Sequence, residues 1–217
     1  MNEVIGAHHE FHDEEFVTGW ADRFVPTPER MDLFNIILSE LRSRVPPNGC
    51  VVELGIGPGY LADYLLNGML DIRYYGVDFS VPMLNIAGHR LKPHAHRVAY
   101  VRADLVMDEW WADIPSPISA IVSTWALHDL GSQENVRNVY KSCAQVLQDG
   151  GILLNGDFIK PDRAIYEYEP GRFEIEKHIA MLRLVGFKHA DCLVVLEEEI
   201  NAPTPAQNYA CFRGVVS

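Results

Sequence analysis

Short apolar segments, separated by glycine and proline, run through most of the chain. Some of these segments are too short and too apolar for a surface helix, and they predict buried strands at residues 50–54, 72–77, 98–101, 118–123 and 152–159. The stretches between them carry apolar residues at helical spacing. Strands that alternate with helices in this way predict a parallel sheet in an α/β fold.

The ends of two helices can be predicted from capping residues. Ser132 is expected to start a helix whose apolar face continues to residue 147, and the run 149–151, Asp-Gly-Gly, is expected to end it. An earlier helix is expected to start at Thr27 and to stop before the prolines at 46–47. This earlier helix precedes the first strand.

The end of the chain departs from the alternation. A helix there stops at Gly186, and strand-like segments follow at residues 192–196 and 209–216 with only a short connection between them. We therefore expect a terminal antiparallel hairpin. Because no internal repeat, low-complexity tract or long linker divides the chain, a single domain is predicted.

The bulk composition agrees with one domain and narrows the choice of partner. The chain has 217 residues, of which 48% are hydrophobic, and this is enough for one sizeable core. Its 18 Lys and Arg against 30 Asp and Glu give a net charge of -12, which disfavours a nonspecific phosphate-binding surface. A small or neutral ligand fits this charge better than a nucleic acid does.

The residues at the start of the chain and the cysteines indicate the cellular location of the protein and whether it binds a metal. Residues 1–15 are acidic and rich in histidine, with no basic segment leading into an apolar run, and no later stretch is apolar for long enough to cross a bilayer. We expect a soluble, cytoplasmic protein without a membrane partner. The four cysteines lie far apart without metal-finger spacing, which predicts reduced thiols. Histidine-rich chain ends are usually solvated, so no metal site is expected at residues 8–15.

Three glycines, Gly55, Gly57 and Gly59, follow directly on the first predicted strand. A glycine-rich turn between a buried strand and a helix lets the backbone approach a ligand, and the helix N-terminus adds a partial positive charge. About 20 residues later a nucleotide-binding fold needs a carboxylate for the ribose hydroxyls, and Asp78 stands there. The third glycine comes one residue earlier than in GxGxxG, where Tyr60 stands instead, and this spacing disfavours a bound dinucleotide.

The segment 53–59 resembles the first motif of class I S-adenosylmethionine-dependent methyltransferases, an acidic residue followed by Gly-x-Gly-x-Gly. Residues 77–84 and 101–105 resemble the second and third motifs of that family, and residues 121–128 resemble its fourth strand and the exit from it. The resemblance implies an α/β fold: one Rossmann-like domain with a seven-stranded, mostly parallel sheet, an antiparallel last strand and helices on both faces.

The resemblance also divides the chain and assigns a cofactor. Residues 27–217 would form the methyltransferase domain, and residues 1–26 would form an N-terminal lid-like segment. The cofactor would be S-adenosyl-L-methionine, with Asp78 holding the ribose, Phe79 and Met83 packing on the adenine, and Asp104 with the Leu105 backbone reading the adenine edge. The full set of expected cofactor-binding residues is Glu53, Gly55, Gly57, Gly59, Asp78, Phe79, Met83, Asp104, Leu105, Ser123 and Thr124.

His128 and Asp129 follow the fourth predicted strand, at the end where α/β folds place ligands. They are the candidate catalytic residues, with His128 as a general base, although a histidine at such a position can also merely cap or pack. This exit resembles the branch of the family that acts on small molecules, except that Asp129 stands where a second histidine is common. The implied reaction is in-line attack by an atom of a small-molecule acceptor on the sulfonium methyl group.

Residues from two further segments are candidates to bind the acceptor. The loop after the fifth strand contains aromatic and basic side chains, and the N-terminal segment carries apolar aromatics that form a lid in the resembling family. An ordinary exposed loop and packing on the flank of the domain are the alternatives. The expected acceptor-binding residues are Trp20, Tyr166, Tyr168 and Arg172.

Two other functions remain open at this stage. Residues 176–187 and 208–214 also resemble enzymes that modify the wobble uridine of tRNA through a carboxylated form of the cofactor. The chain could also bind the cofactor without catalysis and act as a partner or regulator. The RNA function requires one basic face formed by Arg163, Arg172, Lys177 and Arg183. The identity of the acceptor and the oligomeric state are not determined by the sequence.

Overall fold

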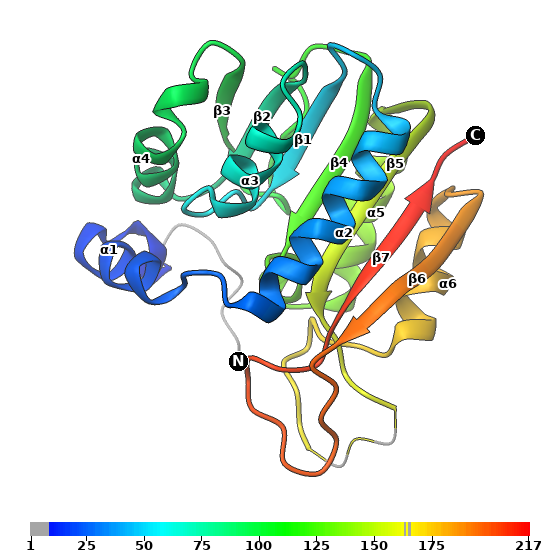
Figure 1. The fold of residues 1–217 in the computed structure, drawn as a ribbon. Helices are drawn as coiled ribbons and strands as arrows, with labels where there is room; N and C mark the ends of the chain where they lie inside the picture. The colour runs from blue at the N-terminus through cyan, green and yellow to red at the C-terminus, as the bar shows by residue number, and fades with distance from the viewer. Residues whose placement is uncertain (1–8, 163, 165) are drawn as a thin grey trace.

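The computed structural model describes residues 9–162, 164 and 166–217. Residues 1–8, 163 and 165 lie outside the described part of the chain. His8 of the histidine-rich start and Arg163 of the candidate basic face are among them. Figure 1 shows a central sheet with helices packed against it.

Seven strands of the described chain form one sheet in the order β3-β2-β1-β4-β5-β7-β6. All neighbouring pairs are parallel except those of β7, which is antiparallel to both β5 and β6. This arrangement confirms the predicted mostly parallel sheet with an antiparallel last strand. The strands are β1 (Cys50–Leu54), β2 (Arg73–Asp78), β3 (Val98–Arg102), β4 (Ile118–Thr124), β5 (Leu147–Phe158), β6 (His189–Leu196) and β7 (Tyr209–Val215).

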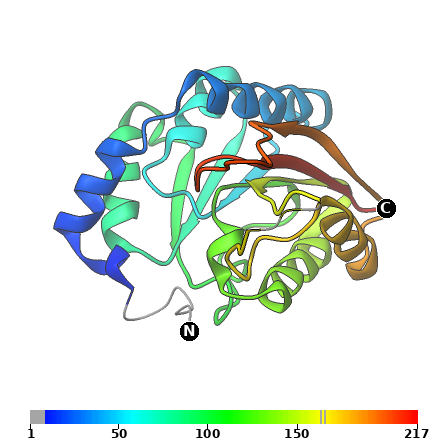
Figure 2. The same ribbon diagram turned by 90° about the horizontal axis from the view of Figure 1, so that it is seen from below.

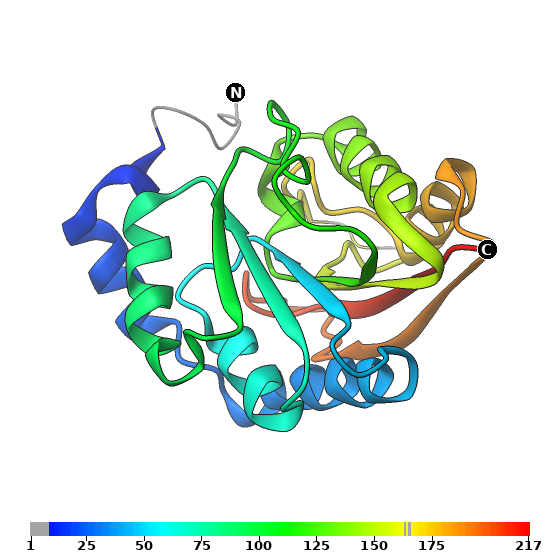
Figure 3. The ribbon, with the colours of Figure 1, turned by 90° about the horizontal axis from the view of Figure 1, so that it is seen from above.

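Helices lie on both faces of the sheet. Helices α2 and α3 cover one face, whereas α5 and α6 cover the other, and α1 lies beside α4 at the edge nearest β3 (Figures 2 and 3). The α-helices are α1 (Glu14–Arg23), α2 (Pro28–Arg44), α3 (Tyr60–Gly68), α4 (Val81–Arg90), α5 (Gln133–Val146) and α6 (Ile175–Val185). Short 3-10 turns are η1 (Glu10–His12), η2 (Lys92–His94) and η3 (Leu127–Leu130).

The order of the strands places a ligand crevice in the middle of the sheet. Strand β1 has β2 on one side and β4 on the other, so the chain changes direction across the sheet at this pair. In open α/β sheets, ligands bind at such a switch point, beyond the carboxyl ends of the strands. The residues that follow β1, β2 and β4 are therefore the ones that the fold brings together.

The core consists of two hydrophobic clusters, one on each face of the sheet. Successive side chains of a strand point to opposite faces, so Val51 belongs to the cluster under α2 and α3, and Val52 belongs to the cluster under α5 and α6. The strands are apolar at almost every position because both faces are covered. The four cysteines are free thiols, and only Cys192 among them is not buried.

Several predicted helix ends are confirmed by capping contacts. The Thr27 hydroxyl accepts a hydrogen bond from the backbone N–H of Arg30, with Pro28 in the first turn, and α2 ends before the prolines at 46–47. Ser132 caps α5 in the same way, through the N–H of Asn135. In the described residues, no helix has the length and apolar character needed to cross a membrane.

The predicted helix from Ser132 to residue 147 is confirmed to within one residue, but the Asp-Gly-Gly run at 149–151 does not end it. The helix ends at Val146, and β5 begins at once with Leu147, which pairs with Ile118 of β4. A register shift follows before Ile152 pairs with Ala120, and Gly150 has a φ of 72° within it. The Asp-Gly-Gly run therefore forms an irregular stretch of strand, because tertiary pairing with β4 overrides the local stop signal.

The terminal hairpin is confirmed, and its connection covers the residues that the predicted strands leave between them. Strands β6 and β7 pair along their length, and β7 inserts between β6 and β5. The connection, residues 197–208, is closed by Asn208, whose side chain accepts from the N–H of Glu199 at 2.8 Å and donates to its carbonyl at 2.9 Å. This local bonding lets a long loop replace a tight turn.

Candidate functional site

A cavity of about 280 Å³ opens where the carboxyl ends of β1, β2 and β4 meet. Its polar wall comes from the ends of the strands and the loops after them, and includes Glu53, Asp78 and His128. Its apolar wall includes Phe11 and Trp20 from the N-terminal segment, which closes the cavity from the side of α4. The site therefore joins residues from distant parts of the chain.

The loop after β1 is bent back against the end of β2. The backbone N–H groups of Gly55 and Ile56 both donate to the carbonyl oxygen of Val77, at 2.9 and 3.0 Å. Gly57 has a φ of 51°, which favours glycine, and a Cβ at this position would meet no other atom of the protein within 4 Å. The space beside Gly57 is thus open toward the cavity that this residue lines.

Asp78 ties the two loops together at the end of β2. One carboxylate oxygen accepts from the N–H of Gly57 and the other accepts from the N–H of Ser80, both at 2.9 Å. Each oxygen has a second lone pair, so both can still accept from the hydroxyl groups of a ligand. Burial raises the pKa of Asp78 to about 6, although these backbone donors and His12 oppose the shift.

Glu53 lies under the glycine loop and is 1% exposed. The hydroxyl of Tyr74 donates to its carboxyl group at 2.7 Å. Burial, together with the nearby charge of Asp78, raises the pKa of Glu53 to about 8 despite this hydrogen bond. At neutral pH this carboxyl group is therefore mostly protonated, and a cation placed in the cavity would favour its ionised form.

The N-terminal segment covers the loop that follows Asp78. The Ser80 hydroxyl donates to the carbonyl oxygen of Phe11, and the His12 ring meets the ring of Phe79 edge to face at 5.2 Å. Tyr60 at the start of α3 donates to the carbonyl oxygen of Ala21 at 3.3 Å. These contacts hold η1 and α1 across the opening of the cavity.

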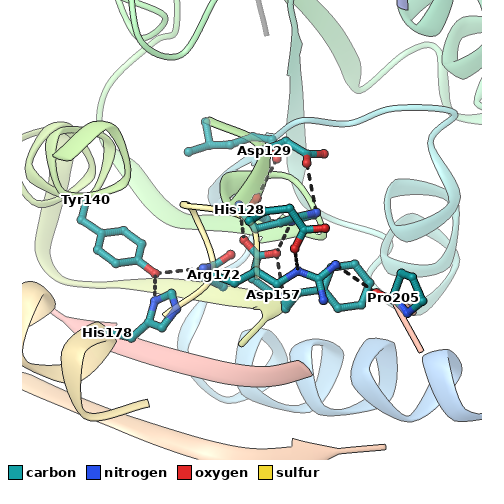
Figure 4. A network of polar contacts seen from close by, with 12 residues as sticks. His128, Asp129, Tyr140, Asp157, Arg172, His178 and Pro205 are labelled. Atoms are coloured by element: carbon teal, nitrogen blue, oxygen red, sulfur yellow. Dashed lines mark hydrogen bonds and ion pairs between the residues drawn. The ribbon is translucent and has the colours of Figure 1, made fainter. Parts of the chain in front are cut away.

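His128 is the histidine of the polar wall, and it is bound to a buried carboxylate (Figure 4). Its Nδ1 lies 2.7 Å from Oδ1 of Asp157, a residue of β5 that is 1% exposed. The backbone N–H groups of His128 and Phe158 also donate to the carboxylate of Asp157, at 3.0 and 2.8 Å. These three contacts fix the imidazole ring and assign its Nδ1 proton to the bond with Asp157.

The other ring nitrogen of His128 faces Asp129. Nε2 lies 3.2 Å from Oδ1 of Asp129, whose side chain is 43% exposed and therefore free to turn toward solvent. Burial lowers the pKa of His128, but the charges of Asp157 and Asp129 outweigh it, so the pKa is raised above its ordinary value. For Asp157 the pairing with His128 outweighs burial, and its pKa is lowered. His128 can therefore hold a proton in a site where Asp157 stays ionised.

A second polar group lies behind this pair, inside the core (Figure 4). Asn155, two residues before Asp157 in β5, donates to the hydroxyl of Tyr140 at 2.9 Å. That hydroxyl lies 2.9 Å from Nδ1 of His178, and the His178 ring is stacked between Phe173 and Phe212, at 3.7 and 4.2 Å. Burial lowers the pKa of His178 to about 3, so its ring is neutral.

Comparison with known proteins connects this site to a family. A family model described as a methyltransferase domain matches residues 51–151. An uncharacterized methyltransferase of Bacillus cytotoxicus is 33% identical over 119 residues, which cover 55% of this chain and 51% of the relative. Another, from a Geobacillus species, is 28% identical over 156 residues, 68% of each chain. The chain therefore spans about half the length of the first of these relatives.

Solved structures of methyltransferases share the fold of this chain. The N-methyltransferase NodS of Bradyrhizobium japonicum, solved with S-adenosyl-L-homocysteine, superposes with a TM-score of 0.67 and 16% identity, covering 89% of this chain and 90% of its own. The CurJ carbon methyltransferase superposes with a TM-score of 0.72 and 16% identity, covering 94% and 59%. At this identity the likeness establishes the shared fold.

Residues 51–151 therefore form a methyltransferase domain, and the chain as a whole has the fold of S-adenosylmethionine-dependent methyltransferases.

Most of the predicted site residues of this methyltransferase line one cavity. Each expected region of the cofactor site is represented there: the glycine loop, the end of β2, the start of α4 and the loop after β3. Both candidate catalytic residues and Trp20 also line it. The predicted residues that line the cavity are Trp20, Glu53, Gly55, Gly57, Asp78, Phe79, Met83, Asp104, Leu105, Thr124, His128 and Asp129.

Three predicted cofactor residues of the methyltransferase have structural contacts that qualify their expected roles. Ser123 does not line the cavity, because it is fully buried and its hydroxyl donates to the carbonyl oxygen of Leu54 at 2.9 Å. Gly59 lies outside it too, at the N-cap of α3 and in close contact with α4. Asp104 lines the cavity, but one of its oxygens accepts from the N–H of Val106 at 2.8 Å.

The described residues of the loop that was expected to bind the acceptor do not line the cavity. Tyr166 bonds to the backbone of Asn201, and neither it nor Tyr168 lines the cavity. Arg172 is buried, paired with Glu169 at 2.7 Å, and its guanidinium lies 4.2 Å from the Phe158 ring. Through Arg172, this loop contacts Phe158, a residue that lines the cavity.

The same contacts bear on the expected basic face. Arg172 is buried, Lys177 is paired with Glu174 at 2.9 Å, and Arg183 donates to the carbonyl oxygen of Ala190 at 3.1 Å. The described members therefore do not present a shared cationic surface. No group of three or more His, Cys, Asp or Glu suited to a metal ion occurs within the described residues.

Five residues of the candidate site were not predicted from the sequence. Phe24, Phe34, Trp125 and Phe158 line the cavity, and Asp157 holds His128. A carboxylate near the carboxyl end of an otherwise apolar strand was a usable signal for Asp157, as it was for Asp78. The aromatic residues carried no such signal, because aromatic residues in core elements are usually only packing.

Proposed function

We propose that this protein transfers a methyl group from S-adenosyl-L-methionine to a small-molecule acceptor. The observation that carries the proposal is the position of the His128–Asp157 pair in the wall of the same cavity as the glycine loop and Asp78. A nucleotide-binding loop and an oriented base that face one space can bring a donor and an acceptor together.

The residues of the cavity fit the proposed cofactor. The open space beside Gly57 accommodates a group in close contact with the backbone, and both oxygens of Asp78 keep lone pairs for ribose hydroxyls. Glu53 supplies an acid beside the cationic end of the cofactor. Phe79 and Met83 offer apolar surface for the adenine. When bound, the cofactor supplies a methyl group on a sulfonium centre.

In this proposal the chain contributes positioning, a proton acceptor and exclusion of water. Asp157 keeps the His128 ring in one orientation with its Nδ1 proton donated, and Nε2 is the atom that takes a proton from the acceptor. Asp129 has to turn away from Nε2 before that transfer. The N-terminal residues Phe11 and Trp20 act as a lid that closes the cavity over both ligands.

Calorimetric titration with S-adenosyl-L-homocysteine tests the cofactor site. We expect the wild-type protein to bind, and Asp78→Ala and Gly57→Ala to lose at least about tenfold in affinity, since a methyl group at Gly57 would enter the cofactor space. Gly150→Ala is the matched control, because Gly150 also has a positive φ with nothing near its missing Cβ and does not line the cavity. Normal binding by Gly57→Ala would contradict the proposal.

Two rival functions are separated by further measurements. A tRNA-directed enzyme would bind tRNA with a steep dependence on salt, whereas we expect no such binding from a protein of net charge -12. A noncatalytic cofactor-binding protein would produce no S-adenosyl-L-homocysteine from S-adenosyl-L-methionine with any acceptor. Formation of that product, abolished in His128→Asn, would support the enzyme.

A further inference from the structure

The acceptor side of the cavity is an aromatic wall, defined here by Trp20, Phe24, Phe34, Trp125 and Phe158. Neighbouring rings of the wall contact one another. The ring centres of Trp20 and Phe24 are stacked 4.4 Å apart, and those of Phe24 and Trp125 lie 6.0 Å apart. Trp125 and Phe158 both meet the ring of Tyr209, at 5.5 and 6.2 Å, and Phe158 meets the ring of His128 edge to face at 4.9 Å. Through Tyr209, the ring contacts extend from α1 to the proposed base.

Rings of this wall are already paired with cations from outside the cavity. The guanidinium of Arg30 lies 4.3 Å from the Phe24 ring centre and 4.9 Å from that of Trp125, and Arg172 lies 4.2 Å from Phe158. Neither arginine lines the cavity. A guanidinium over a ring satisfies the negative potential of its π face, so these rings gain little from a second cation. They are better suited to a neutral or electron-rich ring.

The charges that do face the cavity exclude another class of acceptor. Among the described residues that line it, none is Lys or Arg, whereas Glu53, Asp78, Asp104 and Asp129 are acidic. A carboxylate or phosphate on the acceptor would lose its hydration without a Lys or Arg to pair with. These charges therefore disfavour an anionic acceptor.

The His128–Asp157 pair favours one kind of reacting atom. A neutral amine attacks through its free lone pair and can lose its proton afterwards, so it does not require a fixed base during attack. A hydroxyl oxygen becomes a strong nucleophile only as its proton leaves. The imidazole of His128 is bonded to a buried carboxylate, which the backbone N–H groups of His128 and Phe158 also hold in place, and it provides a base for this step.

We propose that the acceptor is an uncharged, planar aromatic compound that carries a phenolic hydroxyl group and is methylated on that oxygen. This inference rests on the proposed function. The O–H bond breaks as its proton moves to Nε2 of His128, and the oxygen forms a bond to the methyl carbon. The bond between that carbon and sulfur breaks with its electron pair left on sulfur, which yields an aryl methyl ether and S-adenosyl-L-homocysteine. His128 then releases its proton to solvent past Asp129.

Three probes of the same shape test the acceptor class: 2-naphthol, 2-naphthylamine and 2-naphthoate. Their binding is measured by calorimetry on the protein saturated with S-adenosyl-L-homocysteine, without any reaction. We expect 2-naphthol to bind at least about tenfold more tightly than 2-naphthoate, because no Lys or Arg among the described lining residues can pair with the carboxylate and four acidic residues repel it. Trp20→Leu should weaken 2-naphthol binding, whereas the control Trp111→Leu, outside the cavity, should not.

Turnover with S-adenosyl-L-methionine, followed by mass spectrometry, decides the reacting atom. We expect the methyl ether of 2-naphthol to form, no N-methyl product from 2-naphthylamine, and His128→Asn to bind 2-naphthol but not methylate it. Preference for the amine or the carboxylate, or absence of 2-naphthol binding to a protein that binds S-adenosyl-L-homocysteine, would overturn the acceptor class alone. Failure to bind S-adenosyl-L-homocysteine would instead overturn the proposed function.

Discussion

Asp157 is the residue on which the proposed chemistry of the cavity depends most. Its carboxylate accepts from the side chain and the backbone of His128 and from the backbone of Phe158, and it is almost completely buried. An ionised carboxylate in the core persists only with such partners. The same contacts that keep Asp157 ionised give His128 its orientation and its raised pKa.

Replacing Asp157 by asparagine tests this dependence. Asn keeps the shape of the side chain but removes the charge, so we expect the pKa of His128 to fall and kcat/KM for methyl transfer to drop by about 10²- to 10⁴-fold. The pKa is measured by NMR titration of the His128 ring, and the affinity for S-adenosyl-L-homocysteine should be unchanged. An unchanged His128 titration would contradict the assigned role of Asp157.

The raised pKa of Glu53 predicts how cofactor binding depends on pH. Burial raises its pKa to about 8 in the free protein, and the positive charges of the cofactor favour its ionised form. Binding should therefore release a proton, and affinity should increase as the pH rises toward 8, by at most about tenfold per pH unit. Asp78, with a pKa of about 6, adds to this increase at lower pH.

Calorimetry in buffers of different ionisation enthalpy measures that proton release. In Glu53→Gln we expect the release near pH 7 to disappear and the dependence of affinity on pH above 6 to flatten. Glu198→Gln, at an exposed position, serves as the matched control. Equal proton release by the wild type and Glu53→Gln would show that Glu53 does not titrate on binding.

At the scale of elements, the N-terminal segment is the part of the structure best placed to move. Only Val17 and Ala21 of α1 are buried, and η1 has no buried residue. The segment is held by contacts with the loops around the cavity, among them those of Ser80 and Tyr60. Elements with few buried apolar contacts open at low free-energy cost, and lids are drawn from such elements.

Hydrogen exchange tests the lid. We expect amides of α1 (Glu14–Arg23) to exchange more slowly when S-adenosyl-L-homocysteine is bound, because the ligand adds contacts beneath Phe11 and Trp20. Helix α5, on the far face of the sheet, is the internal control and should be unaffected. Equal exchange of α1 with and without the ligand would favour simple packing on the flank of the domain.

At the scale of the whole molecule, the two layers of the core have different character. The layer under α2 and α3 is apolar and supports the glycine loop. The layer under α5 and α6 contains the group of Asn155, Tyr140 and His178 directly behind Asp157. A buried polar group of this kind stabilises the fold only while His178 is neutral.

This condition predicts the acid stability of the protein. The pKa of His178 is lowered from its ordinary value of 6.5 to about 3, so its contribution to the free energy of unfolding is complete above pH 6.5 and is lost as the pH falls toward 3. We expect His178→Gln to be less stable at neutral pH but to lose less stability on acidification, measured by urea unfolding. His189→Gln, at an exposed position, should retain the wild-type slope.

The sequence by itself determined the sheet and the cofactor loop. The positions of the strands follow from apolar runs, and the glycine loop and Asp78 follow from spacing along a single βαβ unit, because the requirements of these features are local. The role of the Asp-Gly-Gly run after α5 was predicted wrongly for the complementary reason: it lies within β5, which starts at Leu147 because this residue pairs with Ile118 of β4.

Only the tertiary structure decided which residues share the cavity. The pairing of His128 with Asp157 spans β4 and β5, and the aromatic wall combines α1, α2 and the ends of both strands, so no local spacing encodes either of them. The packing that turns Arg172 away from the cavity and brings Trp125 and Phe158 into it depends on contacts between elements distant in sequence. The proposed cofactor site thus depends largely on one segment of the sequence, whereas the proposed acceptor site depends on the tertiary fold.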